Sequence, residues 1–335
     1  MRLDAVKWLI ASHAKVGGTI YHQLPSLRAQ LATVPRVQLP TRVLDLRPSS
    51  FSSDRLTFED MRLLISNGET MGHYMTLSHR WGEAHNLELT RENLPAFTKR
   101  IEFRHLPRTY EHAVIVARSL GFRYLWIDAL CIIQHDEHDW LRESAKMATI
   151  YHNASCNIAA HTALDDSHGF LWPNFAQSLA DSAIMKRGWV FQERILSKRI
   201  IHFARGTSFF EDASGVIKPD GIAPENYDPI TNNKMNLEDG LVSQDEWYHL
   251  VERFTTCNLT FETDRLPAVA GLSEYYAQQT IDGKYLWGLW SGSFHQGLLW
   301  VTTAQDTNEL LEGYRAAGMQ PPSWSWARWA GKIRY

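Results

Sequence analysis

The chain has 335 residues, a formal net charge of −3 and 44% hydrophobic residues, which is ordinary for a globular protein. The near balance of charge provides no broad basic surface, so we expect no nucleic-acid partner. No apolar run approaches the roughly 18–20 residues that a membrane-spanning helix needs. The three cysteines form no paired motif, and we expect a reduced, cytoplasmic protein.

The first part of the chain leads into a predicted sheet. Residues 1–38 are weakly patterned, and 39–46 predict an edge strand. Residues 74–79 predict a second strand, which ends at the Arg80-Trp81-Gly82 turn. After a polar connection, a helix is expected to begin at Thr109 as its N-cap and to end at Gly121.

Residues 122–161 organise the rest of the chain. The nearly continuous apolar run from Phe122 to Ile133 predicts a strand buried on both faces. A helix from about 140 to 152 and a strand at 156–160 follow, which is the order of a βαβ unit. Strands alternating with helices predict an α/β domain with a largely parallel sheet flanked by helices.

The later part of the chain contains a predicted linker and an aromatic region. Residues 212–246 are polar and rich in Gly, Pro, Asn and Asp, which indicates a loop. An α+β region follows and is expected to pack on the first domain through its tryptophans, with the Ser-Trp-Ser-Trp segment buried. The expected parts are a lead-in at 1–38, a domain at 39–211, a linker at 212–246 and an α+β region at 247–335.

Several motifs resemble the fungal heterokaryon incompatibility (HET) domain. They are TLSHRWG at 76–82, LPRTYEHAVIVARSLG at 106–121, YLWIDALCIIQ at 124–134 and RGWVFQERILSKR at 187–199. They follow the family's order, and further similar segments extend the resemblance over about 39–330. The chain departs from the family pattern at Ala129, where serine is usual, in a short 170–187 connection, and in the Phe-Glu-Asp sequence at 210–212.

The resemblance implies a fold and a chemistry. The HET domain is thought to resemble the TIR domain, a flavodoxin-like sheet found in immune signalling. Some TIR domains cleave NAD through a helical glutamate in a W-x-x-E setting, and Trp140 and Glu143 reproduce that spacing. The analogy implies NAD as a substrate and no bound cofactor.

The residues themselves also indicate a site. Open parallel sheets bind ligands beyond the carboxyl ends of their strands. His79 and Arg80 follow one strand, Asp128 follows another, and His161 follows a third, so we expect them to converge near the helix that carries Glu143.

We predict catalytic roles for Glu143, Asp128 and His79. Glu143 is expected to face the apolar side of its helix and this cleft, instead of pairing with Lys146. The alternatives are a salt pair or helix-dipole role for Glu143, a structural cap for Asp128 and a satisfied core histidine for His79. The predicted ligand-binding residues are Arg80, Trp81, Trp140, Arg187, Trp189, Gln192 and Glu193.

Two further groups of residues have side chains that could bind a ligand or a metal. Arg187 and Trp189 could bracket a nucleotide by charge and stacking, while the alternative is an ion-paired helix start that joins the two halves of the domain. The His135-x-x-His138 spacing invites a metal interpretation, but it lacks a helical HExxH context and a clear third ligand, so no metal is expected. The chain has no P-loop, no GxGxxG and no GxSxG motif.

Three functions stay open at this point. The first is a HET protein of non-self recognition and cell death that hydrolyses NAD or a related nucleotide. The second is a non-catalytic signalling module that forms homo-oligomers. The third is a HET-fold enzyme of small-molecule metabolism, which the short 170–187 connection favours. The first and third functions, both enzymatic, imply a small-molecule or nucleotide ligand.

Overall fold

The computed structural model describes residues 29–31, 33–47, 60–82, 87–171, 183–204, 207–212, 215–217, 244–279, 283–303 and 307–335. Contacts divide the chain into two compact units, with residues 1–184 and 197–231 in the first and residues 185–196 and 232–335 in the second. Residues 185–196 therefore group with the C-terminal part of the chain, although we expected them within 39–211. The predicted boundaries stay predictions, and much of the 212–246 linker and the 172–182 part of the short connection lie outside the described residues.

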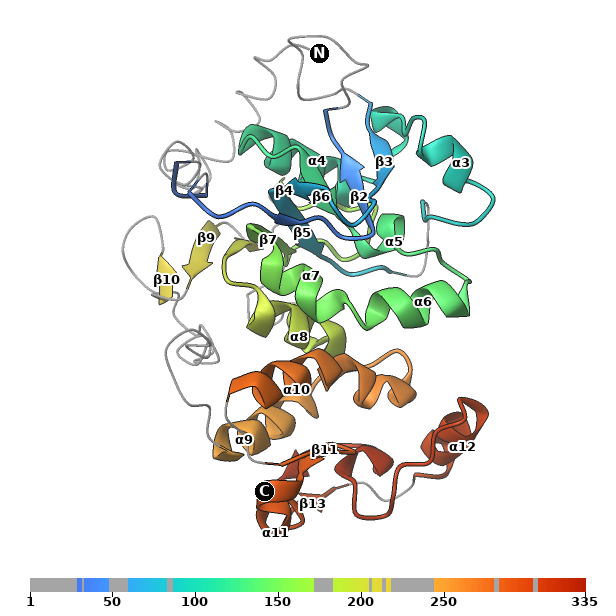
Figure 1. Ribbon diagram of the computed structural model, residues 1–335, viewed down its shortest axis with the longest axis vertical. Helices are drawn as coiled ribbons and strands as arrows, with labels where there is room; N and C mark the ends of the chain where they lie inside the picture. Colours follow the sequence, from blue (N-terminus) through green and yellow to red (C-terminus); the bar gives the residue numbers. More distant parts are fainter. Residues whose placement is uncertain are drawn as a thin grey trace. The chain divides into compact units, whose positions relative to one another are not determined.

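The first unit is built on a mixed sheet of eight strands among the described residues, in the order β10-β9-β8-β7-β5-β6-β2-β3 (Figure 1). Its centre is parallel and consists of β6 (Tyr124–Trp126), β5 (Tyr74–Ser78), β7 (Cys156–Ala160) and β8 (Ile200–Ala204). Antiparallel strands lie on both sides, namely β2 (Arg42–Asp45), β3 (Arg62–Ile65), β9 (Thr207–Asp212) and β10 (Gly215–Ile217). The predicted α/β class is confirmed, with the parallel pairing confined to the centre.

Helices cover the two faces of the parallel centre. The chain crosses from β5 to β6 through α4 (Arg108–Ser119) and returns from β6 to β7 through α6 (Glu137–Ser144) and α7 (Met147–Asn153). Right-handed crossovers in opposite directions place α4 and α7 on opposite faces (Figure 1). Tyr151 of α7 packs edge-on against Trp126 at 5.7 Å between ring centroids, and every residue of β5, β7 and β8 is buried.

The structure corrects four sequence expectations. The strand predicted at 39–46 is present as β2, but its predicted position at the edge of the sheet is wrong, because β2 lies between β6 and β3. The predicted strand over 122–133 ends at Trp126 and continues as the helical turn α5 (Asp128–Cys131), since an apolar run does not distinguish a buried strand from a buried helical turn. The predicted single helix at 140–152 is split into α6 and α7. Pro107, not Thr109, is the N-cap of α4.

The second unit is mainly helical. It contains α8 (Gly188–Leu196), α9 (Gln244–Phe254), α10 (Pro267–Gln279), α11 (Phe294–Gly297) and α12 (Asn308–Ala316). Two small antiparallel pairs accompany them, β11 (Tyr285–Leu286) with β12 (Leu289–Trp290) and β13 (Val301–Thr302) with β14 (Ile333–Arg334).

Tryptophans form the core of the second unit. Trp247, Trp290 and Trp326 are fully buried, and the indole N–H groups of Trp247 and Trp326 both donate to the carbonyl of Gly288 at 3.0 Å. The expectation that the Ser-Trp-Ser-Trp segment is buried is confirmed at Trp326, while Trp324 is half-buried.

The remaining elements are short. In the first unit β1 (Val37–Gln38) pairs with β4 (Met71–Gly72), and α3 (Leu94–Phe97) precedes α4. Short 3-10 helices occupy Phe103–His105, Ala183–Lys186, Glu262–Arg265, Ser291–Ser293 and Trp326–Arg328. Within the described residues, the structure contains no helix with the length and hydropathy that a membrane crossing requires.

Candidate functional site

A cluster of polar and aromatic side chains lies where β5 and β6 end. We call it the His79 cluster, and it consists of His79, Trp81, Tyr110, Asp128 and Asp166. His79 directly follows β5, and Asp128 begins α5 just after β6. The two strands are parallel, so their carboxyl ends share one edge of the sheet. The structure thereby brings His79 and Asp128 together, as the sequence indicated.

The imidazole of His79 is enclosed between two carboxylates. Its side chain is 1% exposed, its Nδ1 lies 3.8 Å from Asp128 Oδ1, and its Nε2 lies 3.2 Å from Asp166 Oδ1. The Tyr110 ring meets it edge-on at 5.3 Å, and the Trp81 ring lies nearly parallel to it at 6.5 Å. These rings and carboxylates leave the imidazole little freedom to rotate.

Asp128 is the member of the cluster whose carboxylate reaches solvent. Its side chain is 17% exposed, whereas those of His79 and Asp166 are 1% and 2% exposed. Its Oδ1 accepts a hydrogen bond from the Ala129 N–H at 2.8 Å, and its Oδ2 accepts one from the Trp81 indole N–H at 2.7 Å. Both oxygens are oriented by donors but keep acceptor capacity for a ligand.

Tyr110 and Asp166 complete the cluster on its buried side. The Tyr110 hydroxyl donates to Asp166 Oδ2 at 2.9 Å. Burial, followed by the negative charges of Asp166 and Asp128, raises the pKa of Tyr110 far above its ordinary value. Tyr110 therefore stays protonated and acts as a permanent donor to Asp166.

Thr109 holds the loop that carries Asp166. Its backbone N–H donates to the Asp166 carbonyl at 2.9 Å, and its hydroxyl donates to the Asp165 carbonyl at 2.9 Å. The same hydroxyl accepts a hydrogen bond from the Gly169 N–H at 3.1 Å. The first turn of α4 thus positions the loop after β7, which is a more specific role than the cap predicted for Thr109.

His112, one turn further along α4, holds the end of the same loop. Its Nδ1 accepts hydrogen bonds from the N–H groups of Phe170 and Leu171 at 2.9 and 3.0 Å. An Nδ1 that accepts two hydrogen bonds carries no proton, so the ring is neutral with its proton on Nε2. Gly169 has φ +71°, a conformation that favours glycine.

Arg80 and Gly82 lie beside the cluster in the turn after β5. Arg80 is exposed, and it has no ion pair with any residue that the structure describes. Gly82 has φ +74° and lies so close to Asp165 that any Cβ would overlap its side chain. The Arg-Trp-Gly sequence therefore fits a tight turn that presents Arg80 to solvent and Trp81 to Asp128.

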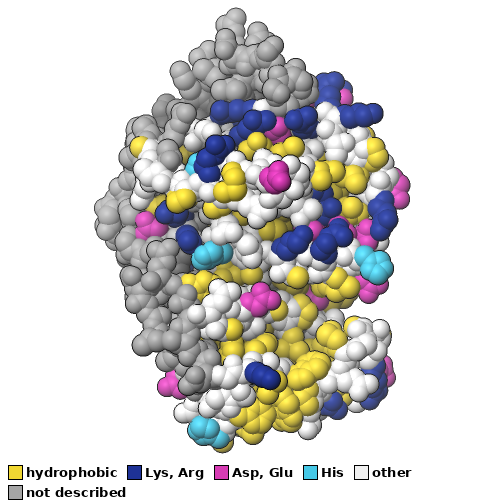
Figure 2. All heavy atoms as spheres, viewed as in Figure 1, with side chains coloured by type: hydrophobic (Ala, Val, Ile, Leu, Met, Phe, Trp, Pro, Cys, Tyr) yellow, Lys and Arg dark blue, Asp and Glu magenta, His cyan; other side chains and the backbone are white. Residues whose placement is uncertain are grey.

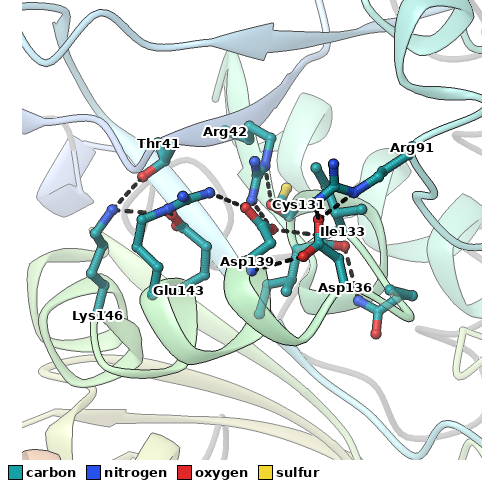
Figure 3. Close-up of polar contacts among 12 residues, drawn as sticks. Thr41, Arg42, Arg91, Cys131, Ile133, Asp136, Asp139, Glu143 and Lys146 are labelled. Carbon is teal, nitrogen blue, oxygen red and sulfur yellow. Dashed lines mark hydrogen bonds and ion pairs between the residues drawn. The ribbon is translucent and has the colours of Figure 1, made fainter.

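Glu143 lies in a different network, on α6 (Figure 3). Its side chain is 3% exposed, and its Oε1 lies 3.0 Å from Lys146 Nζ and 3.3 Å from Arg142 Nε. Lys146 also donates to the Thr41 hydroxyl at 2.8 Å. The expectation that Glu143 avoids Lys146 is wrong, because a buried carboxylate requires a charge partner and α6 ends so that Lys146 reaches back to it.

The same network ties α6 to the sheet. Arg42 of β2 forms a buried ion pair with Asp139, and its Nε donates to the Cys131 carbonyl at 2.6 Å. Asp139 Oδ2 also accepts the Ile133 N–H at 2.8 Å. Dark blue Lys and Arg side chains gather over α6 and the start of α7 on the face shown in Figure 2. The described contacts of Glu143 thus belong to a structural charge network.

Two further residues that the sequence singled out are His161, which follows β7, and Trp140 of α6. His161 Nε2 lies 2.8 Å from His202 Nδ1, and His202 Nε2 lies 2.6 Å from Glu211, all three buried in the first unit. Trp140 is half-buried on α6.

The Arg-Gly-Trp motif contributes to the second unit. The Trp189 indole N–H donates to Asp264 at 3.0 Å, and Gln192 accepts the Gly271 N–H at 3.1 Å, which ties α8 to α10. Arg187 forms a backbone bridge with Asn258, and Glu193 is buried. These contacts give the motif a structural role, and its part in ligand binding stays a prediction.

Comparison with known proteins gives one match. Residues 74–178 match the family model described as Heterokaryon incompatibility protein (HET). No curated protein and no solved structure matches the chain. The matched segment begins with β5, ends after the 165–171 loop and contains every member of the His79 cluster. Residues 74–178 are therefore a HET domain, as the sequence motifs indicated.

Proposed function

We propose that the HET domain hydrolyses the N-glycosidic bond of NAD or a related nucleotide at the His79 cluster. The observation that carries the proposal is the position of Asp128. It is the solvent-reaching end of a series of acid–base groups that continues inward through His79 to Asp166. A parallel sheet centre with helices on both faces supports a flavodoxin-like or TIR-like arrangement, in which ligands bind at this edge.

The cluster suits the chemistry of this reaction. The bond between the ribose carbon and the nicotinamide nitrogen breaks, and its electron pair leaves with nicotinamide. The developing oxocarbenium charge on the ribose is stabilised by a carboxylate held beside it, the role proposed for Asp128. Water then adds to the same carbon, and its proton passes to Asp128, the carboxylate that reaches solvent, with His79 and Asp166 behind it. The products are nicotinamide, ADP-ribose and one proton.

Arg80 and Trp81 supply groups that recognise a nucleotide. An exposed guanidinium without an ion pair among the described residues suits a diphosphate. The Trp81 indole fixes the Asp128 carboxylate and offers an aromatic surface beside it. In the cell, the proposed role is that of a cytoplasmic effector of non-self recognition that ends in cell death.

A non-catalytic signalling module is the competing function. The near-complete burial of His79 and Asp166 favours it, because a structural lock between β5, α4 and the 165–171 loop would have the same contacts. Such a module would act by self-association. The two functions differ in whether Asp128 is needed for turnover or only for folding.

The test is nicotinamide release from NAD by the purified chain and two matched variants. Asp128→Asn keeps the shape of the side chain and removes the charge. Asp60→Asn is the control, because Asp60 is 22% exposed and likewise accepts one backbone N–H, from Phe103 at 2.9 Å. We expect turnover by the parent chain, a loss of about a hundredfold or more in Asp128→Asn and near-parent turnover in Asp60→Asn.

Thermal unfolding of all three proteins accompanies the assay. Loss of turnover in an Asp128→Asn variant that melts like Asp60→Asn supports catalysis. No nicotinamide release by the parent chain contradicts NAD hydrolysis, and parent-level turnover in Asp128→Asn contradicts the site.

A further inference from the structure

A hollow lies at the opposite end of the parallel strands from the His79 cluster. It has a volume of about 330 Å³, and Arg36, His73, Arg123 and Tyr124 contribute to its lining. His73 directly precedes β5, and Arg123 directly precedes β6. The hollow therefore lies at the amino end of the strands, and the proposed function makes no use of it.

Strand pairing brings two basic side chains together at this hollow. Val37 of β1 pairs with Gly72 of β4 in antiparallel register, so the next position places Arg36 opposite His73. Arg36 is exposed, and no acidic side chain pairs with it among the residues that the structure describes. Burial, followed by the positive charge of Arg36, lowers the pKa of His73.

His73 also has a polar atom without a partner. Its Nδ1 is buried and makes no hydrogen bond with any residue in the described part of the chain. Buried polar atoms nearly always have a hydrogen-bond partner, and a ligand or an ordered water in the hollow would supply one for this nitrogen. This observation is independent of the charge of Arg36.

Arg123 supplies a fixed cation on the other side. Its guanidinium donates to both oxygens of Asp45 at 2.8 and 2.9 Å and lies 5.1 Å from the centroid of the Tyr124 ring. Asp45 does not line the hollow, and its charge is shared with Arg62 at 3.6 Å. None of the described lining residues is acidic, so the hollow carries a positive charge.

We infer that this hollow binds a small phosphate-bearing molecule, with Arg36 and His73 as its principal ligands to the phosphate. Ligand sites in proteins measure about 300–1,000 Å³, so the hollow has room for a group the size of pyrophosphate or a mononucleotide. A phosphate would pair with the Arg36 guanidinium and supply a partner for His73 Nδ1. The Tyr124 ring would lie beside the rest of the ligand.

The test uses pyrophosphate as the probe in isothermal titration at constant ionic strength. Arg36→Gln removes the cation with little effect on folding, because Arg36 is exposed. The control is Arg104→Gln, since Arg104 is 76% exposed and pairs with Glu102 away from the hollow. Arg80→Gln is measured in parallel, so that any pyrophosphate bound beside the His79 cluster is counted separately from the binding that depends on Arg36.

We expect saturable binding to the parent chain that weakens about tenfold or more in Arg36→Gln, because the phosphate loses its charge-assisted hydrogen bonds to the guanidinium. His73→Gln should weaken binding by a smaller factor. Arg104→Gln should bind like the parent chain. The inference is overturned if the parent chain does not bind saturably, if Arg36→Gln binds normally, or if Arg104→Gln loses as much affinity as Arg36→Gln.

Discussion

Replacing Gly169 by alanine tests how α4 holds the loop that carries Asp166. Gly169 has φ +71°, and a Cβ at this position would lie 2.6 Å from His112 Nδ1. That nitrogen accepts the N–H groups of Phe170 and Leu171. Gly169→Ala therefore strains the backbone and pushes His112 away from the two N–H groups that it satisfies.

The loss of stability expected for Gly169→Ala has two parts. A left-handed conformation costs an alanine about 1–2 kcal/mol, and an overpacked buried position costs a further ~1–3 kcal/mol. Gly68→Ala isolates the first part, because Gly68 has φ +82° and its nearest neighbour would lie 3.5 Å from the new Cβ. Gly169→Ala should therefore lower the free energy of unfolding by about 2–5 kcal/mol and Gly68→Ala by about 1–2 kcal/mol.

Urea unfolding of the two variants gives the free energies, and hydrogen exchange gives the local effect. The amides of Phe170 and Leu171 should exchange faster in Gly169→Ala than in Gly68→Ala, because they lose their acceptor. Equal costs for the two variants, with unchanged exchange of these amides, would refute the role assigned to His112.

Two further predictions concern pH. Burial raises the pKa of Asp264, although the hydrogen bond from the Trp189 indole opposes the shift. The native state therefore holds the carboxyl proton of Asp264 more tightly than the unfolded state does. The stability that this proton provides is lost as the pH rises through the native pKa. Asp264→Asn, which keeps an acceptor for Trp189, should thus gain melting temperature over the parent chain at pH 7 but not at pH 3, and the opposite order would contradict the burial of the charge. The raised pKa of Tyr110 means that its contribution to stability is complete below the ordinary value of 10.0 and is lost above it. Tyr110→Phe should lower the free energy of unfolding by about 1–3 kcal/mol at pH 7, because Asp166 loses a hydrogen-bond donor. In urea titrations above pH 10, the free energy of unfolding should fall less steeply with pH in this variant than in the parent chain. Equal slopes for the two proteins would count against a buried, protonated Tyr110.

The sequence was sufficient to predict the edge of the sheet where the His79 cluster lies. Apolar strands followed by polar residues identify carboxyl ends, and parallel pairing brings such ends to one edge. His79 and Asp128 were found in this way. The partners Tyr110 and Asp166 were missed, because their contact joins residues far apart in the chain and depends on where α4 meets the loop after β7. The sequence offered one indication of this contact, namely the adjacent polar residues Thr109 and Tyr110 at the start of the helix and Asp165 and Asp166 in the loop.

The environment of Glu143 could not be predicted for a related reason. Helical periodicity correctly indicated a buried face for Glu143, and the side chain is buried. Helical periodicity did not show that α6 ends at Ser144 or that Arg42 of β2 forms an ion pair with Asp139. Those features place cations around α6, so a buried carboxylate there is neutralised locally instead of facing the strand ends.

Comparing the two candidate carboxylates in one assay tests the central claim most directly. The measurement is kcat/KM for nicotinamide release from NAD by Asp128→Asn and Glu143→Gln, each scored with its melting temperature. Hydrolysis at the His79 cluster predicts a loss of about a hundredfold or more for Asp128→Asn and near-parent activity in folded Glu143→Gln. Near-parent activity in Asp128→Asn together with a large loss in folded Glu143→Gln would contradict the account and move the catalytic site to α6.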